Sequence, residues 1–284
     1  FMFAQLAQVA QADAKINETN VYEEANAQTR TFMDKLAGEN LAEGSRIGGE
    51  ENFEAFFDAV ESGKSGLILM EHYSNLDLPA LIYLLEHSGN SKCKELASRV
   101  VAIAGMKLNE DNPMVRAFAE SFTRVVIYPT RSLNKIEDAE ARAAEEAKAR
   151  KINLAAMKAM DKCKKQGKVI LVFPSGTRYR PGKPETKKGL REIDSYLRLF
   201  DKMILVSING LSLHIDPEHP DDMLADIIEP DKMVFTASPV YDCKSFRKEY
   251  MASLPAEEED PKQRIIDHVM SLFDEQHEKV ASSL

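Results

Sequence analysis

Short apolar runs alternate with longer amphipathic segments along most of the chain. Short runs bounded by polar or turn residues are typical of buried strands, and apolar residues at helical spacing are typical of helices that cover a sheet. Because the two kinds of segment alternate, the pattern predicts an α/β fold with a mixed, mostly parallel sheet flanked by helices. The strands are expected at residues 66–70, 100–104, 125–128, 169–173, 203–208 and 233–240.

The first 60 residues lack such runs, and their apolar residues recur at helical spacing, as at Phe53, Phe56 and Phe57. The sequence therefore predicts an N-terminal helical segment at residues 1–60 and an α/β domain at residues 61–284. We expect the segment to pack as a helical layer on the domain. The alternative is that its apolar face contacts a membrane or a lipid chain.

The longest predicted helix covers residues 136–166, with a break near Asn153 as the alternative. Its first half is dense in Glu, Arg and Ala, which indicates a solvated face. Its second half is more apolar on one side and ends in a group of lysines, which suit the negative end of a helix dipole. These lysines are Lys162, Lys164, Lys165 and Lys168.

The first candidate for chemistry is the pair His72 and Asp77, which lies between the strand predicted at 66–70 and a helix predicted at 78–85. Open α/β sheets bind their ligands at this edge, where strands end and helices begin. A neutral imidazole accepts a proton near pH 7, and does so better when a carboxylate holds its other nitrogen. Residues five apart lie about 140° from each other around a straight helix, so the pair needs a turn to meet.

The ordinary interpretation of this pair is a surface histidine and an unrelated aspartate near a helix start. Asn75 and Asp77 are both candidates for the N-cap of the following helix, because their side chains can accept hydrogen bonds from its first amides.

A second block follows the apolar run at 169–173. It is a turn, Pro174-Ser175-Gly176-Thr177, that leads into Arg178 and Arg180. Arginine offers a rigid fork of donors that matches phosphate oxygens, so two arginines at the end of a strand indicate an anion site. A third basic residue, Arg131, ends the run that begins at Val125.

Together these blocks resemble the glycerolipid acyltransferases, which carry an H-x4-D motif and a later F-P-E-G-T-R motif. His72 and Asp77 match the first motif, and residues 173–178 match the second except at Ser175, where most members have Glu. The plastid-type glycerol-3-phosphate acyltransferases have P-S-G and two arginines spaced as here. Ser132 departs from that type, which has a Lys-His pair near this position. The resemblance covers roughly residues 60–215.

The resemblance implies an O-acyltransferase of phospholipid synthesis that moves a fatty acyl group from acyl-carrier protein or acyl-CoA to glycerol-3-phosphate. The alternative acceptor is 1-acylglycerol-3-phosphate. His72 would be the general base and Asp77 its partner, and no cofactor or metal is implied. The residues implied in substrate binding are Arg131, Ser175, Gly176, Thr177, Arg178 and Arg180.

Composition adds limits to this interpretation. The net charge of −9 argues against general nucleic-acid binding, which uses basic surfaces. Three cysteines far apart in the sequence indicate free thiols in a reducing compartment. No apolar run is long enough to span a bilayer. We therefore expect a cytoplasmic protein that meets membranes at most peripherally.

Two other hypotheses remain open from the sequence. The chain could be a lipid- or carrier-binding protein of the same fold that has lost catalysis, although the presence of both His72 and Asp77 argues against this. It could also be an α/β interaction domain in which the motif matches are accidental. An acyl-transfer assay separates the enzyme from both.

Overall fold

The chain divides into two compact units, each built from two separate stretches of sequence. The structure is a computed structural model that describes residues 9–110, 113–133, 136–220 and 222–283. Unit 1 comprises Phe1–Lys35 and Val101–Gln166. Unit 2 comprises Leu36–Val100 and Gly167–Leu284. The division of the sequence at residue 60 stays a prediction.

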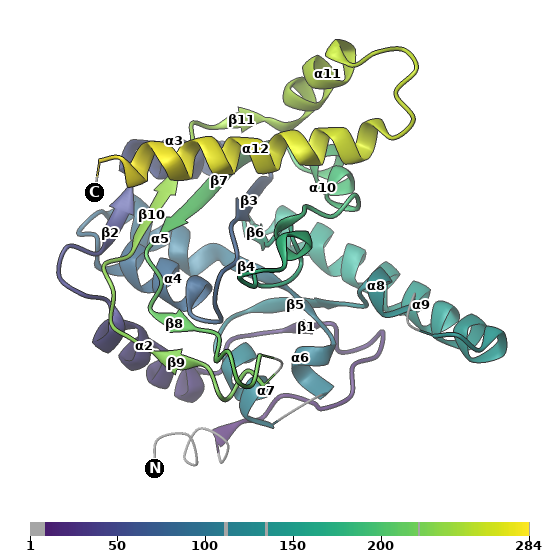
Figure 1. Ribbon diagram of the computed structural model, residues 1–284, viewed down its shortest axis with the longest axis horizontal. Helices are drawn as coiled ribbons and strands as arrows, with labels where there is room; N and C mark the ends of the chain where they lie inside the picture. Colours follow the sequence, from purple (N-terminus) through teal and green to yellow (C-terminus); the bar gives the residue numbers. More distant parts are fainter. Residues whose placement is uncertain (1–8, 111–112, 134–135, 221, 284) are drawn as a thin grey trace. The chain divides into compact units, whose positions relative to one another are not determined.

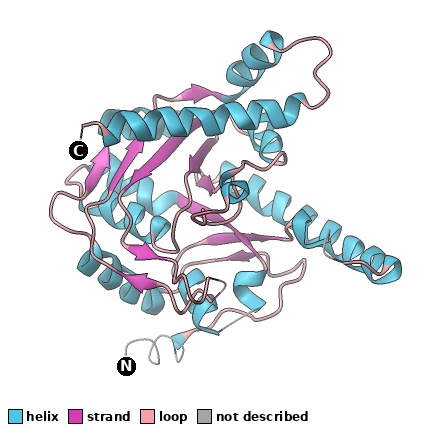
Figure 2. Ribbon diagram, viewed as in Figure 1, coloured by secondary structure: helices cyan, strands magenta, loops and turns pink. Residues whose placement is uncertain are grey.

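A mixed sheet forms the centre of unit 2 (Figures 1 and 2). Its strands are β2 (Arg46–Gly48), β3 (Gly66–Met70), β6 (Val169–Val172), β7 (Lys202–Asn209), β10 (Val234–Ala237) and β11 (Tyr241–Asp242). β3 lies between β6 and β7 and runs parallel to both. β10 pairs antiparallel with β7 and parallel with β2, and β11 pairs antiparallel with β7. Every residue of β3 is buried, as its continuous apolar run predicts.

Helices cover this sheet. They are α3 (Glu50–Glu61), α4 (Asp77–His87), α5 (Ser91–Arg99), α10 (Ile193–Leu199), α11 (Cys243–Ser253) and α12 (Pro261–Ala281). Both α3 and α12 pack on β7. The buried side of α3 carries the phenylalanines that the sequence places at helical spacing. A short 3-10 helix (Pro184–Lys187) and a two-stranded sheet of β8 (Leu213–His214) and β9 (Ile227–Ile228) complete the unit.

Unit 1 has its own strands and helices. Its strands are β1 (Tyr22–Glu23), β4 (Val100–Gly105) and β5 (Arg124–Ile127), and β5 pairs parallel with β4 and antiparallel with β1. The helices that follow β4 are α6 (Lys107–Glu110), α7 (Pro113–Ala119), α8 (Thr130–Leu133) and α9 (Ala139–Lys165). The α/β class with a mixed sheet and flanking helices is therefore confirmed.

Helix α9 continues through Asn153 without a break, so the alternative that the sequence left open is wrong. The Asn153 side chain lies against the backbone of Tyr128, whose amide donates to Oδ1 at 2.8 Å and whose carbonyl accepts from Nδ2 at 3.0 Å. These bonds tie α9 to the end of β5. A polar residue that looked like a helix breaker is therefore a packing contact.

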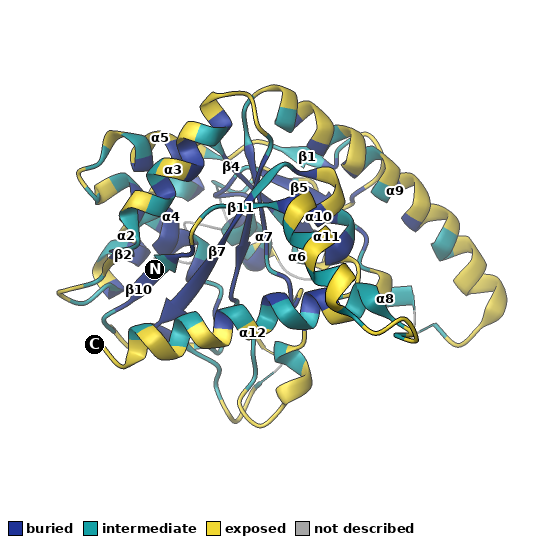
Figure 3. Cartoon of the chain, turned by 90° about the horizontal axis from the view of Figure 1, so that it is seen from above, coloured by how far each residue is buried: buried dark blue, intermediate teal, exposed yellow. Residues whose placement is uncertain are grey.

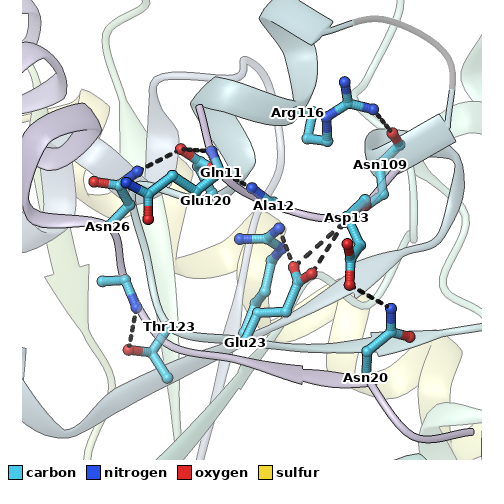
Figure 4. A network of polar contacts seen from close by, with 12 residues as sticks. Gln11, Ala12, Asp13, Asn20, Glu23, Asn26, Asn109, Arg116, Glu120 and Thr123 are labelled. Carbon is cyan, nitrogen blue, oxygen red and sulfur yellow. Dashed lines mark hydrogen bonds and ion pairs between the residues drawn. The ribbon is translucent and has the colours of Figure 1, made fainter. Parts of the chain in front are cut away.

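The first 60 residues contain helices α2 (Ala27–Asn40) and α3, and also the short strands β1 and β2. Strands this short leave no alternation that periodicity could reveal. Carboxylates of unit 1, one buried and one half-buried, form polar contacts in this part of the chain (Figure 4). Glu120 accepts the backbone N–H groups of Gln11 and Ala12, and Glu23 pairs with the fully buried Arg124.

Candidate active site

His72 and Asp77 meet on the turn that joins β3 to α4. β3 ends at Met70 and α4 begins at Asp77, so the turn brings the aspartate back toward the histidine. His72 Nδ1 lies 2.9 Å from Asp77 Oδ2. Because the carboxylate accepts this hydrogen bond, Nδ1 carries the proton and Nε2 is the basic nitrogen. The expected position of His72, at the carboxyl end of a buried strand, is confirmed.

The Asp77 carboxylate is fully buried and held by the backbone just before it. Its Oδ2 accepts the amide of Tyr73 at 2.6 Å and the amide of Ser74 at 2.9 Å. Its Oδ1 accepts the Ser74 hydroxyl at 2.8 Å. The prediction that Asn75 or Asp77 caps α4 is wrong, since the N-cap is Leu76 and no side chain caps it. The carboxylate instead faces the turn, which fixes it beside the imidazole.

The His72 imidazole is also fixed by the second motif. Its ring stacks on Phe173, with centroids 3.9 Å apart and an angle of 19° between the planes. Its backbone carbonyl accepts the amide of Tyr179 at 2.8 Å. The side chain is 16% exposed, and no hydrogen bond from any described residue reaches Nε2. The basic nitrogen is therefore available to a hydroxyl group of a substrate.

The turn after β6 has the conformation that its sequence requires. Gly176 has a φ of +61°, a left-handed value that suits glycine, and its amide donates to the Phe173 carbonyl at 2.9 Å. Ser175 is buried and its hydroxyl donates to the carbonyl of Thr177 at 2.7 Å. Ser175 thus stabilises the turn, while Gly176 is exposed and Thr177 is half-buried.

Arg178 forms an ion pair with Asp226, which lies beside β9. Both side chains are almost completely buried, at 7% and 2% exposure. Burial raises the pKa of Asp226, and the Arg178 guanidinium acts against that rise. Asp226 Oδ1 is buried without a hydrogen-bond partner among the described residues. An anionic substrate that reaches Arg178 would therefore compete with the Asp226 carboxylate for the guanidinium. Only one oxygen of that carboxylate has a hydrogen-bond partner among the described residues.

The remaining basic residues differ in how they are placed. Arg180 is half-buried, its amide donates to Thr186 Oγ1 at 2.9 Å, and its charge acts on Asp226. Arg131 lies on α8 of unit 1, and its side chain is outside the described residues. Arg178 and Arg180 thus belong to one region of unit 2 with His72. The role of Arg131 stays a prediction.

A buried carboxylate next to the motif, Glu71, was not foreseen from the sequence. It accepts the Tyr73 hydroxyl at 2.8 Å and the amide of Ile208 at 2.7 Å. His277 of α12 lies 3.4 Å from the same carboxylate, which raises the pKa of this histidine. The contact joins residues far apart in sequence, so neither residue signals it alone. It fixes the chain on both sides of His72.

Two further observations concern metal sites and membrane-spanning helices. Within the described residues, no group of three or more His, Cys, Asp or Glu side chains is arranged to hold a metal ion. None of the described helices is both long enough and apolar enough to cross a membrane.

Comparison with known families gives one match. The family described as Acyltransferase matches residues 45–200, which is more than half of the chain. The matched stretch contains the His72–Asp77 pair, the stacked Phe173 and both arginines of the second motif. A search of curated proteins gave no significant match.

Proposed function

Because the chain belongs to the Acyltransferase family, we propose that it transfers a fatty acyl group from a thioester donor to a hydroxyl of a phosphate-bearing glycerol. Acyltransferase activity in general follows from the family. The proposal concerns the acceptor, the donor and the residues. One observation carries it: a buried carboxylate holds Nδ1 of a histidine whose Nε2 forms no hydrogen bond with a described residue.

The proposed reaction needs no covalent intermediate on the protein. His72 Nε2 takes the proton of the acceptor hydroxyl as its oxygen attacks the thioester carbonyl carbon. Asp77 stabilises the imidazolium that forms. The tetrahedral intermediate then expels the thiolate, which receives the proton from the imidazolium, and the ester is released. The backbone amide of Thr177 is the proposed donor to the oxyanion, since the Gly176 amide already donates to the Phe173 carbonyl.

The phosphate of the acceptor is the proposed ligand of Arg178 and Arg180. Arg180→Ala is the cleaner test, because Arg178→Ala also leaves Asp226 buried without its partner. We expect Arg180→Ala to raise KM for the acceptor by about one to two decades, since a charge-assisted hydrogen bond contributes roughly 1.5–3 kcal/mol. kcat at saturating acceptor should change little. Steady-state kinetics with acceptor titration measures both.

Lys248→Ala on α11 is the control. Lys248 is exposed, and its substitution also removes one positive charge. Asp226→Asn tests Arg178 without deleting it. If phosphate competes with the Asp226 carboxylate, this variant should bind the acceptor about tenfold more tightly. The proposal would be wrong if Arg180→Ala left KM for the acceptor unchanged and Asp226→Asn bound the acceptor more weakly. The phosphate would then bind at other residues.

Glycerol-3-phosphate is the preferred acceptor in this proposal, and 1-acylglycerol-3-phosphate is the alternative. The Pro174-Ser175-Gly176 turn and the spacing of the two arginines favour the first, whereas Ser132 departs from the type that uses it. We expect a competition assay with both acceptors to give the higher specificity constant for glycerol-3-phosphate. A higher value for the acylated acceptor would reverse the choice and leave His72 and Asp77 in their roles.

The donor is tested in the same assay by supplying acyl-CoA and acyl-carrier protein separately. Binding of an acyl donor without transfer to either acceptor would favour a lipid- or carrier-binding protein. The intact His72–Asp77 hydrogen bond argues against that outcome.

A further inference from the structure

Helix α9 of unit 1 has one buried face and one exposed face. The buried residues recur at helical spacing, and α9 packs against β5, where Ala149 and Ile152 join the hydrophobic core. They are Ala149, Ile152, Ala156, Met160 and Cys163. The opposite face is exposed along the whole helix (Figure 3). Its packing within unit 1 therefore leaves a long, straight surface for another contact.

This exposed face is strongly basic at its C-terminal half, in contrast to the chain as a whole. Residues 147–165 of the helix contain seven basic residues and one acidic residue, whereas the chain has a net charge of −9. The helix dipole accounts only for charges in the last turn. Arg150, Lys151 and Lys158 lie one or more turns before the end of the helix at Lys165. The dipole therefore does not explain them.

Two large apolar side chains lie in the middle of this basic face. Leu154 is 55% exposed and Met157 is 51% exposed. At 3.6 residues per turn, Leu154 lies directly opposite the buried face and between Lys151 and Lys158. Neither lysine forms an ion pair with a residue that the structure describes. Packing within the unit gives no reason for apolar side chains to stand at this position.

We propose that the exposed face of residues 147–165 of α9 docks on a membrane surface that contains anionic lipids. Basic residues near such a surface are attracted to its negative potential, and apolar side chains between them can enter the headgroup region. The part of α9 from residue 147 to Lys165 presents a line of contact about 28 Å long, which suits a plane. Because only two large apolar side chains insert, the binding should be reversible and sensitive to salt. This inference is independent of the proposed reaction.

Vesicle sedimentation with the full chain tests the proposal. We expect binding to vesicles of phosphatidylglycerol and phosphatidylcholine, and little binding to phosphatidylcholine alone. Lys151→Gln with Lys158→Gln should weaken the partition coefficient about 25-fold, or roughly fivefold for each charge. Lys94→Gln with Lys248→Gln removes two exposed charges from other helices and should leave the partition nearly unchanged.

A second pair of variants tests the apolar contribution. Leu154→Gln should weaken binding about tenfold, because one buried aliphatic side chain is lost from the lipid contact. Leu224→Gln is its control, since Leu224 is 45% exposed on another segment. All six substituted positions are at the surface, and circular dichroism checks that the variants are folded. No binding to anionic vesicles at low salt, or equal losses in the variants and their controls, would overturn the proposal.

Discussion

His72→Ala should reduce the rate of acyl transfer by about 10²- to 10⁴-fold while the protein stays folded. This is the usual contribution of a general base. The imidazole supplies Nε2, which forms no hydrogen bond with a described residue, so the change removes the proposed proton acceptor together with the contacts to Asp77 and Phe173. Steady-state kinetics at saturating acceptor gives the change in kcat, and thermal unfolding checks the fold.

A matched control is His87→Ala, since His87 is exposed and lies at the other end of α4. It deletes the same side chain and should leave the rate unchanged. Acceptor binding by His72→Ala should be close to that of the original protein, because the phosphate contacts are elsewhere. A folded His72→Ala protein that keeps its rate would show that another group takes the proton.

Asp77→Asn should reduce kcat by about 10²-fold with little change in acceptor binding. The amide oxygen can stand where Oδ2 stands now and accept the same three N–H groups, from His72, Tyr73 and Ser74. The Ser74 hydroxyl can turn and accept from the new amide nitrogen. The arrangement is kept but the negative charge that stabilises the imidazolium is lost.

Asp77→Ala separates charge from structure in the same experiment. It leaves the buried amides of Tyr73 and Ser74 without an acceptor, and each costs about 1–3 kcal/mol of unfolding free energy. We expect it to lose both activity and thermal stability, whereas Asp77→Asn loses mainly activity. Asp58→Asn is the control, because Asp58 is exposed and pairs with Lys92. Full activity in Asp77→Asn would show that the negative charge of Asp77 is not needed for the reaction.

Features that depend on residues close together in the sequence could be predicted from the sequence. The continuous apolar runs marked β3, β6 and β7, because a strand buried on both faces has no polar alternation. His72 could be placed at the end of a strand because the run stops just before it. The need for a turn between His72 and Asp77 followed from helical geometry alone.

Features that join distant residues could not be predicted. Asp226 lies in an acidic loop, and nothing near it in sequence shows that its partner is Arg178. The contact between Glu71 and His277 spans most of the chain. These pairs are set by which strands and helices pack together, and that information is not contained in local periodicity. The short strand β2 was missed because its pairing with β10 is a tertiary contact.

The order in which the chain is synthesised bears on when the site can form. β3 leads into the turn that holds His72, and it pairs with β6 and β7, which follow it by about a hundred residues or more. The stretch from Val101 to Gln166 belongs to unit 1 and interrupts unit 2. Closing so long a loop is slow, since its entropy is lost before the strands pair. On the ribosome, β3 therefore emerges well before β6 and β7. Its apolar side chains and unpaired backbone groups stay exposed until those two strands are synthesised.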